Sequence, residues 1–446
     1  MNICFVHPDL GIGGAERLVV DAAAGLVRKA HNVVIYTSYH NKDHCFEETR
    51  DGTLEVRVLG NDLFPSSLFG NRFRALCAYL RNLHLAAILW ANQEEFDVII
   101  VDQISTSIPI LRQLGKVLFY CHFPDKLLTQ RETFLKSLYR WPIDLVEEWT
   151  TGQAEKIVVN SKFTLGVFEK SFPSIKVTPD VLYPSIHTQS YDRPEDANHP
   201  SVDALKSDHA LILSINRFER KKNIGLAIKA FASLIKDPNP IPDANKLRLV
   251  VAGGYDPQCI ENVEHLRELD KLAKELGLKT HTLQDNTPSP ASTQVVFLPS
   301  FSTPQRTYLL TNSRCLVYTP SNEHFGIVPV EAMYAKLPVV AVNSGGPRES
   351  IQDGETGYLV EPETYAVADA IRQILSSSDL ATSLGEQGRA RVEKMFTSTA
   401  FDDRLLFLVE ELACSPINDT SRFSYIFAFC VCWLLYPFIA LFGKDS

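Results

Sequence analysis

The chain has 446 residues, a hydrophobic fraction of 45% and a formal net charge of −9 at pH 7. This length predicts roughly two or three domains, and the acidic balance argues against a nucleic-acid-binding protein, which is usually basic. The nine cysteines include no Cys-x-x-Cys pair, so we expect free thiols in a reducing compartment, with neither a disulfide framework nor a zinc site.

Short apolar runs alternate with helical patterns along the chain, and they form two series. The first series predicts strands at residues 2–6, 33–36, 54–58, 97–101, 116–120 and 156–159. The second predicts strands at residues 210–215, 247–252, 295–298, 315–318, 339–342 and 357–360. Near-continuous Val, Ile and Leu runs are typical of parallel strands that are buried on both faces. We therefore expect an α/β fold with two doubly wound, Rossmann-like domains.

The composition between the two series sets the domain boundaries. We place an N-terminal domain at residues 1–200 and a C-terminal domain at residues 201–397, with a polar linker over residues 192–209. Helical patterns cover residues 18–27 and 227–235, and polar stretches at 237–245 and 280–293 predict exposed loops. A closing helix and linker follow at residues 398–422. Because ligands of such sheets bind beyond the carboxyl ends of the strands, we expect the active cleft between the domains.

Two apolar stretches raise the question of membrane contact. Residues 423–442 carry no charge and match the thickness of a bilayer core, so we expect a C-terminal membrane segment; the alternative is a buried helix of the globular part. Residues 76–91 are too short and too polar to span a membrane. They could lie in the membrane interface, but the favoured interpretation is an internal helix that is partly exposed to lipid. The start of the chain, a strand pattern over residues 2–6, does not resemble a signal peptide.

A glycine-rich loop follows the first predicted strand and precedes a helix. Gly11 and Gly13 begin a Gly-x-Gly-x-x-Gly pattern, but Glu16 occupies its last position, so the dinucleotide fingerprint is incomplete. The glycines either let a ligand approach the backbone at a helix start or form a simple tight turn. We assign Gly13 and Gly14 to substrate binding.

Cationic residues follow the first strand of the second series. Arg217, Lys221 and Lys222 lie in the loop that leads to the next helix, which Asn223 could cap. Two cations at a strand end could clamp a diphosphate, and they would stabilise the charge of a departing nucleoside diphosphate most in the transition state. The alternative is a solvated basic turn.

Two carboxylates flank a predicted loop-to-helix junction. Glu323 precedes the junction and Glu331 lies inside the helix, whose first turn accommodates Pro329. Unpaired amides at a helix start, together with the helix dipole, form an anion site. The amides expected there belong to Phe325, Gly326 and Ile327. Such a site suits a sugar nucleotide, with one acid for the sugar and one for the ribose; the alternative is two unrelated glutamates.

Three further features point toward strand ends. His122 follows a strand of the first series and could bind the transferred sugar or the acceptor, although a lone histidine is more often structural. The pairs Gly253–Gly254 and Gly345–Gly346 bring bare backbone to strand ends in the second series. No two aspartates are separated by a single residue, so we expect no metal, with Arg217 and Lys222 in its place.

Four motifs carry a family resemblance that covers about residues 1–412. They are HPDLGIGGAER at residues 7–17, FYCHFPD at 119–125, NRFERKKN at 216–223 and YTPSNEHFGIVP at 318–329. The chain resembles glycosyltransferase family four, whose members are retaining enzymes of GT-B architecture, with two Rossmann-like domains facing a cleft. Within that family it is similar to the eukaryotic alpha-1,3/1,6-mannosyltransferases of dolichol-linked oligosaccharide assembly.

The resemblance implies substrates and a location. The donor would be GDP-mannose, and the acceptor a dolichyl diphosphate carrying two N-acetylglucosamines and one mannose, to which one alpha-1,3 and one alpha-1,6 mannose are added. No cofactor is implied. The enzyme would work on the endoplasmic reticulum membrane with its catalytic domains in the cytosol, in contact with membrane lipid and with other enzymes of the pathway.

The resemblance also implies residue roles. Glu323 would contact the donor sugar, Glu331 the ribose, and His122 the sugar end, while Arg217 and Lys222 would bind the diphosphate. The chain departs from the family pattern at two positions. Asn216 stands where many relatives have glycine, and His324 adds a titratable group beside the sugar.

Two other functions compete with this one. A nicotinamide-dependent oxidoreductase needs a complete glycine fingerprint and an acidic residue about 20 positions further on, and the chain has neither where they are required. A non-catalytic membrane-bound subunit would not need to keep the carboxylate, cation and histidine set intact. We therefore expect a transferase that retains configuration by front-face attack.

Overall fold

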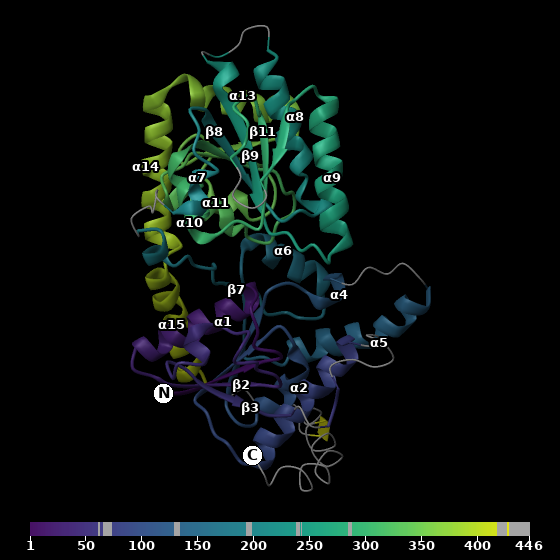
Figure 1. Cartoon of the computed structure of the whole chain (residues 1–446). Coiled ribbons are helices and arrows are strands. Elements are labelled where there is room, and N and C mark those ends of the chain that lie inside the picture. The colour runs from purple at the N-terminus through teal and green to yellow at the C-terminus, as the bar shows by residue number, and fades with distance from the viewer. Residues whose placement is uncertain are drawn as a thin grey trace. The chain divides into compact units, whose positions relative to one another are not determined.

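The computed structural model describes residues 1–60, 63–65, 74–128, 134–192, 199–237, 241, 243–283, 288–416 and 426–427. The chain forms two compact units (Figure 1). Unit 1 comprises Met1–Pro184 together with Ser398–Ser446, and unit 2 comprises Ser185–Thr397. Helix α15, which is the last helix named among the described residues, therefore belongs to the same unit as the first strand.

A parallel sheet of seven strands forms the centre of unit 1. Its order is β3-β2-β1-β4-β5-β6-β7, and every neighbouring pair is parallel. The strands are β1 (Asn2–His7), β2 (Asn32–Thr37), β3 (Glu55–Val58), β4 (Val98–Asp102), β5 (Lys116–Cys121), β6 (Lys156–Val159) and β7 (Asp180–Val181). The helices are α1 (Gly14–Arg28), α2 (Arg74–Ala91), α3 (Ile108–Leu111), α4 (Asp125–Leu128), α5 (Phe134–Thr151), α6 (Lys162–Ser171) and α15 (Ser398–Cys414).

Successive side chains of these strands enter two different cores, as the alternation of a pleated strand requires. Phe5 lies in a core with apolar residues of α1 and α15, whereas Val6 lies in a core with residues of α2, α3 and α6. Helices thus cover both faces of the sheet, which explains the uninterrupted apolar strands.

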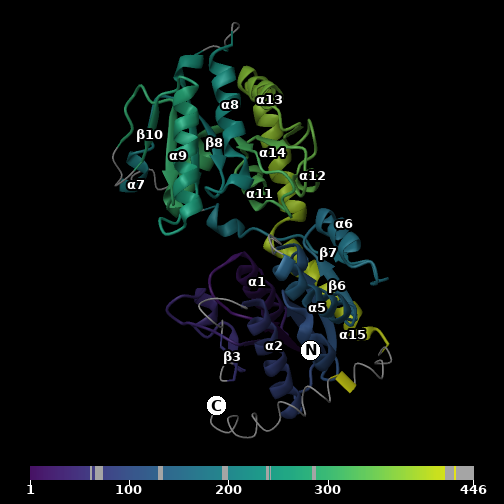
Figure 2. The same ribbon diagram turned by 90° about the vertical axis from the view of Figure 1, so that its right-hand side faces the viewer.

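Unit 2, which Figure 2 shows from another side, repeats this plan with the strand order β10-β11-β9-β8-β12-β13-β14, again all parallel. The strands are β8 (Ala210–Ile215), β9 (Leu247–Gly253), β10 (Thr280–Thr282), β11 (Val295–Pro299), β12 (Ser313–Tyr318), β13 (Val339–Val342) and β14 (Tyr358–Val360). The helices are α7 (Pro200–Asp203), α8 (Ile224–Ile235), α9 (Ile260–Glu275), α10 (Thr303–Asn312), α11 (Ile327–Tyr334), α12 (Pro347–Ser350), α13 (Thr364–Ser376) and α14 (Ser378–Met395). Helices α8, α9 and α13 share one core with the sheet.

The strand orders fix where each unit can bind a ligand. In unit 1 successive strands lie further outward in opposite directions from β1 and β4, and in unit 2 they do so from β8 and β12, except that β10 lies at the edge beyond β11. At such a switch point the loops leave the sheet on opposite sides, and a crevice opens beyond the carboxyl ends of the strands. We therefore expect the functional residues in the loops that follow these four strands.

All twelve predicted strands are present, so the prediction of two parallel α/β domains is confirmed. Two short edge strands, β7 and β10, were not predicted. The prediction that residues 280–293 form only an exposed loop was wrong at its start, because Thr280–Thr282 pairs with β11. A strand of three residues has too little apolar pattern to be recognised.

The two candidate membrane stretches have different outcomes. Helix α2 contains residues 76–91 and buries its polar side chains Arg81, Asn82 and His84 within unit 1, as the reading of an internal helix expects. The predicted segment 423–442 lies outside the described residues, apart from 426–427. Among the residues that are described, none of the helices combines the length and apolarity that a bilayer crossing requires.

Candidate active site

Helix α11 begins directly after the loop that carries Glu323. Its N-cap is Gly326, whose φ of +80° is readily accessible to glycine. The first amides of a helix have no carbonyl partner within it and carry the positive end of the helix dipole. The helix is held in place by Val330 and Met333, which are fully buried. This start therefore has the geometry of the predicted anion site.

Lys222 meets Glu323 across the switch point of unit 2. The Lys222 Nζ lies 2.6 Å from the Glu323 Oε2, although the residues are 101 positions apart in the sequence. The Tyr318 hydroxyl donates to the same carboxylate oxygen over 2.9 Å. Thr319, just after β12, donates its hydroxyl to the Lys222 carbonyl over 2.8 Å and ties the two loops together. The structure thus brings together the predicted cation and the predicted acid.

These contacts set the charge of Glu323. Burial alone would raise the pKa of its carboxyl, but the hydrogen bond and charge of Lys222 and the hydrogen bond from Tyr318 lower it. Glu323 is therefore an ionised acceptor at neutral pH. A group held in this way can stabilise positive charge on a neighbouring sugar but is poorly suited to deliver a proton.

The other predicted cations are placed differently. The side chains of Arg217 and Lys221 are 72% and 73% exposed, and both contact Glu219, at 3.8 and 3.1 Å. Their exposed side chains can change conformation, whereas the Lys222 side chain is held by its contact with Glu323. Asn223 occupies the N-cap of α8, but the prediction that its side chain caps the helix was wrong: it makes no capping bond, and its φ of +50° places it in the left-handed region. Asparagine tolerates that conformation better than most residues, which accounts for it at this sharp turn.

Glu331, in the second turn of α11, has a side chain that is 13% exposed, and its contacts are with Arg306 and Tyr191. Its Oε1 is 3.6 Å from the Arg306 Nη1, and Tyr191 donates a hydrogen bond to it. Burial raises the pKa of this carboxyl, and Arg306 and Tyr191 oppose the rise. Arg306 also stacks over the Tyr191 ring at 4.7 Å. Sequence reasoning missed both partners, because nothing in their local pattern marks them.

The glycine pairs of unit 2 have a structural explanation. A Cβ at Gly345 would lie 2.4 Å from the Glu323 carbonyl oxygen, and one at Gly346 would lie 2.3 Å from the Phe325 Cα. The Gly346 amide donates to the Glu323 carbonyl over 2.8 Å. The turn therefore presses directly on the backbone of the Glu323 loop and holds it in place.

A similar contact explains Gly253, where a Cβ would lie 1.7 Å from the Asn216 carbonyl oxygen. The missing side chains at Gly253, Gly345 and Gly346 let neighbouring loops pack closely on one another. The contact of these glycines with a ligand stays a prediction. Of the remaining predicted residues in the Glu323 loop, Phe325 buries its ring against Phe396 at a centroid distance of 5.6 Å, and His324 is half-buried.

Three strand ends of unit 1 converge on one buried carboxylate. Asp102, the last residue of β4, lies 2.8 Å from the His7 Nδ1 at the end of β1 and 2.6 Å from the His122 Nε2 just beyond β5. His122 is thus placed at the sheet edge, as predicted, and it is the only member of this trio that the sequence analysis singled out. His7 and Asp102 become visible only when the strand order makes β1, β4 and β5 neighbours.

The charges in this trio reinforce one another. Burial would lower the pKa of His7, but the hydrogen bonds to Asp102 and Glu16 and their charges raise it to about 9. Burial would raise the pKa of Asp102, but the charge of His122 and the hydrogen bonds of both histidines lower it to about 2. His7 is therefore a cation and Asp102 an anion at neutral pH.

The glycine loop connects to the same trio. A Cβ at Gly13 would lie 2.2 Å from the Glu16 Oε2, so Gly13 leaves room for Glu16 to turn toward His7, whose Nε2 lies 3.9 Å from the Glu16 Oε1. At Gly14 no atom lies within 4 Å of an added Cβ. Glu16, which breaks the dinucleotide fingerprint, thus faces His7 and helps to raise the pKa of its imidazole.

Comparison with known proteins agrees with this architecture. The family described as Glycosyltransferase Family 4 matches residues 12–189, and the family Glycosyl transferases group 1 matches residues 196–287 and 289–391. Sucrose-phosphate synthase from Thermosynechococcus elongatus has a similar structure, with a TM-score of 0.68 at 21% identity over 92% of this chain and 98% of its own. Likeness at that identity shows the fold, which is the predicted GT-B type.

Two relatives are much closer in sequence. The alpha-1,3/1,6-mannosyltransferase ALG2 of Rhizomucor pusillus is 52% identical over 430 residues, which cover 94% of each chain. The alpha-1,3/1,6-mannosyltransferase ALG2 of Homo sapiens is 46% identical over 421 residues, which cover 92% of this chain and 96% of the relative. The chain therefore belongs to the alpha-1,3/1,6-mannosyltransferase family of glycosyltransferases.

Proposed function

We propose that the chain transfers mannose from GDP-mannose to a dolichyl-diphosphate-linked oligosaccharide, forming one alpha-1,3 and one alpha-1,6 linkage. The acceptor carries two N-acetylglucosamines and one mannose before the reaction and three mannoses after it. The observation that supports this most directly is the contact between Lys222 and Glu323 at the start of α11. A sugar diphosphate needs a cation, an acid and free amides close together, and this contact at the start of α11 supports such a site.

The roles of these groups follow from the charge that develops during transfer. The bond between the mannose C1 and the diphosphate oxygen breaks, so negative charge grows on the diphosphate and positive charge on the sugar ring. Lys222 and the α11 amides stabilise the first, and the ionised Glu323 stabilises the second. Arg217 and Lys221, which are exposed, can swing onto the outer diphosphate oxygens.

Configuration is retained by attack from the face that the diphosphate leaves. The acceptor hydroxyl forms the new bond to C1, and its proton moves to the departing diphosphate oxygen, so no side chain is needed as a base. The low pKa of Glu323 and its two hydrogen bonds favour an electrostatic role over nucleophilic attack. His122, oriented by Asp102, binds a hydroxyl of the sugar or of the acceptor.

The location and partners rest on the sequence. The uncharged segment 423–442 anchors the chain in the endoplasmic reticulum membrane, and the free cysteines suit a cytosolic catalytic part. Membrane lipid and other enzymes of the same pathway are the expected neighbours. A nicotinamide-dependent activity finds no support, because Glu16 serves the His7 contact and the chain belongs to a glycosyltransferase family.

Incubation of the purified protein with GDP-mannose and the lipid-linked acceptor tests this proposal. Linkage analysis should find both alpha-1,3 and alpha-1,6 mannose in the product, and UDP-glucose should not replace GDP-mannose. Binding of GDP without transfer to any lipid-linked acceptor would contradict the proposed acceptor. Failure to bind either GDP or GDP-mannose would contradict the donor.

A further inference from the structure

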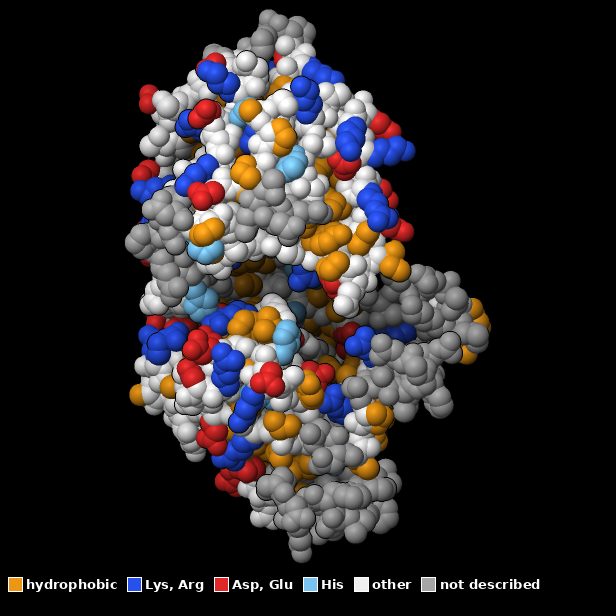
Figure 3. Space-filling view, in the orientation of Figure 1, with side chains coloured by type: hydrophobic (Ala, Val, Ile, Leu, Met, Phe, Trp, Pro, Cys, Tyr) orange, Lys and Arg blue, Asp and Glu red, His pale blue; other side chains and the backbone are white. Residues whose placement is uncertain are grey.

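Helices α4 and α5 turn their apolar side chains toward solvent. The exposed fractions are high for residues of this kind: 50% for Leu127, 61% for Leu128, 81% for Phe134, 58% for Leu138, 63% for Trp141, 51% for Leu145 and 39% for Val146. Four of them, Phe134, Leu138, Trp141 and Leu145, recur at helical spacing along one side of α5. We call these seven residues the α4–α5 apolar face. Hydrophobic side chains are visible at the outer edge of α5 in Figure 3.

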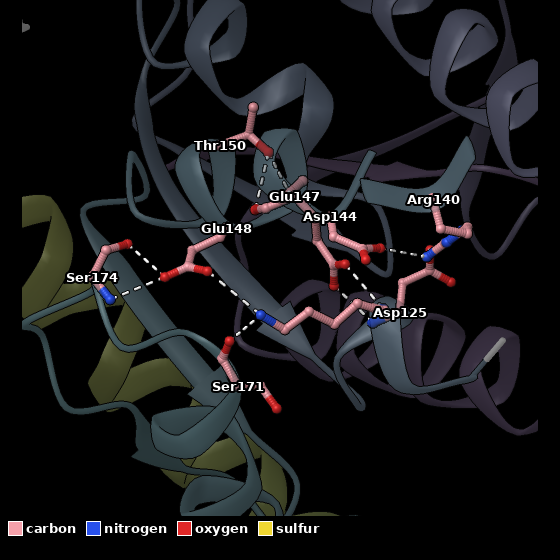
Figure 4. A network of polar contacts seen from close by, with 10 residues as sticks. Asp125, Arg140, Asp144, Glu147, Glu148, Thr150, Ser171 and Ser174 are labelled. Carbon is pink, nitrogen blue, oxygen red and sulfur yellow. Dashed lines mark hydrogen bonds and ion pairs between the residues drawn. The ribbon is translucent and has the colours of Figure 1, made fainter. Parts of the chain in front are cut away.

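The opposite side of α5 is charged and faces inward. Arg140 is 1% exposed, and it pairs with Asp125 on α4 at 2.9 Å and with Asp144 at 3.3 Å. Glu147 is 6% exposed and accepts hydrogen bonds from the amides of Asp125 and Lys126, at 2.7 and 3.0 Å. Figure 4 shows these side chains converging between α5 and the start of α4.

This polar network locks the orientation of α5. A buried arginine or glutamate is tolerated only with its partners in place, and rotating α5 to bury the apolar face would leave Arg140 and Glu147 without theirs. The outward apolar face is therefore an enforced feature of the fold. Helix α9 of unit 2 shows the ordinary arrangement, with Lys, Arg, Asp and Glu side chains along its outer edge (Figure 3).

A second observation indicates what the face meets. The Trp149 ring, on α5, contacts the Phe427 ring with a centroid distance of 5.1 Å. Phe427 lies near the start of the uncharged run 423–442, which is long enough to cross a bilayer core. The chain thus enters this uncharged run beside α5, which carries a large exposed apolar surface.

We propose that the α4–α5 apolar face inserts into the lipid interface of the membrane, parallel to its surface. A helix of this kind sinks its apolar side about 5–10 Å into the boundary between headgroups and acyl chains. The inference deepens the proposed function and rests on it only for the lipid-linked acceptor. Asp125, which the buried network holds, lies three residues after His122, so a docked α5 would present the His122 loop at the membrane surface, where the diphosphate of the acceptor lies.

Quenching by brominated lipid tests the contact in the full-length protein. The protein is reconstituted in phosphatidylcholine vesicles with or without dibromo-phosphatidylcholine, and the emission of Trp141→Phe is subtracted from that of the wild type to isolate Trp141. We expect the Trp141 component to be quenched by brominated lipid. An unquenched component that acrylamide reaches from water would overturn the proposal.

The same measurement separates other occupants of the face. A Trp141 component shielded from both quenchers means that protein covers it, which also overturns the proposal. If Leu138→Asp then changes the oligomeric state, the cover is a second copy of the chain; if it does not, the cover is the chain's own C-terminal segment.

Charged substitutions test the functional consequence. Leu138→Asp combined with Leu145→Asp should raise the KM for the acceptor in vesicles about tenfold, because two apolar side chains are lost from the lipid contact. GDP binding should not change. The matched control is Ile260→Asp on α9, which is 74% exposed and should leave the KM unaltered. An unchanged KM in the double variant would contradict the role of the α4–α5 apolar face in binding the acceptor. A wild-type protein that does not bind GDP would contradict only the proposed function.

Discussion

Glu323 owes the role proposed for it to its contacts with Lys222 and Tyr318. Its carboxylate is pinned by Lys222 and Tyr318, so it is ionised and directed before any substrate arrives. Preorganisation of this kind is what makes electrostatic stabilisation effective, since no rearrangement has to accompany the reaction.

Replacing Glu323 by Gln removes the charge and keeps the shape. We expect transfer to fall about 100- to 1,000-fold, as for the loss of one preorganised electrostatic contact, while GDP binding is largely retained. Single-turnover transfer and GDP titration measure the two effects separately. Transfer at the wild-type rate would show that the carboxylate has no part in the reaction, and a trapped mannosyl adduct on Glu323 would instead indicate double displacement.

Lys222→Ala should weaken GDP binding about 10- to 100-fold, because it removes the charge-assisted contact that we propose between Lys222 and the diphosphate. Lys221→Ala is the natural control: the same residue type, one position away, with a 73% exposed side chain. It should change GDP affinity much less. Calorimetric titration with GDP gives the affinity of both variants. An equal loss of affinity in the two would show that the contact of Lys222 with Glu323 does not matter for GDP binding.

The His7–Asp102 contact predicts a pH dependence of stability. The pKa of His7 is about 9 in the folded chain and 6.5 ordinarily, so its stabilising contribution is complete below pH 6.5 and is lost as the pH rises through 9. The loss amounts to at most about 3 kcal/mol. Urea unfolding at pH 6.5 and at pH 9 should show this decrease in the free energy of unfolding for the wild type. The decrease should be much smaller for Asp102→Asn. An equal slope in the variant would exclude this pair as its source.

At the scale of elements, the turn after β13 packs against the Glu323 loop and supports it. Gly346→Ala should destabilise the protein by about 1–3 kcal/mol, because the new methyl group would overlap the Phe325 backbone and force it to move. Gly14→Ala is the control, since an added Cβ meets no atom within 4 Å there. Thermal unfolding compares the two; a Gly346 variant as stable as the control would show that the loop adapts freely.

The elements also show what sequence reasoning can and cannot reach. Buried strands such as Leu247–Gly253 are recognisable because continuous Val, Ile and Leu have few other uses in a domain of this size. Edge strands of two or three residues carry no such signal. Helix α5 presents a different limit: periodicity reveals that it has an apolar side, but only the partners of Arg140 and Glu147 decide that this side faces outward.

The candidate site divides in the same way. Glu323, Lys222 and His122 could be proposed from strand-end positions and motif resemblance, whereas Asp102, Tyr318, Arg306 and Tyr191 could not. Asp102, Arg306 and Tyr191 act through contacts between segments that are distant in sequence, and these contacts depend on strand order and helix packing rather than on local composition. Tyr318 lies only five residues before Glu323, but the turn that brings the two side chains together is not visible in the local pattern.

At the scale of the whole molecule, α15 completes unit 1 from the far end of the chain. Phe401, Leu405 and Leu408 are buried in the core of α1 and the sheet, and Asp402 pairs with Arg28 at 2.7 Å. A chain ended at Thr397 should therefore lose the fold of unit 1 and keep that of unit 2, as hydrogen exchange resolved by peptide would show. A chain ended at residue 416 keeps α15 and should retain both units. Full protection of unit 1 in the shorter chain would refute this dependence.

The return of α15 has a consequence for the order of events during synthesis. Unit 2 is one uninterrupted stretch, so all of it is synthesised before α15 of unit 1. The middle of the chain can reach its finished state first, while the strands made earliest wait with one side of their sheet uncovered. Such exposed apolar surface is a target for chaperones, and it should persist until the helix that closes it emerges.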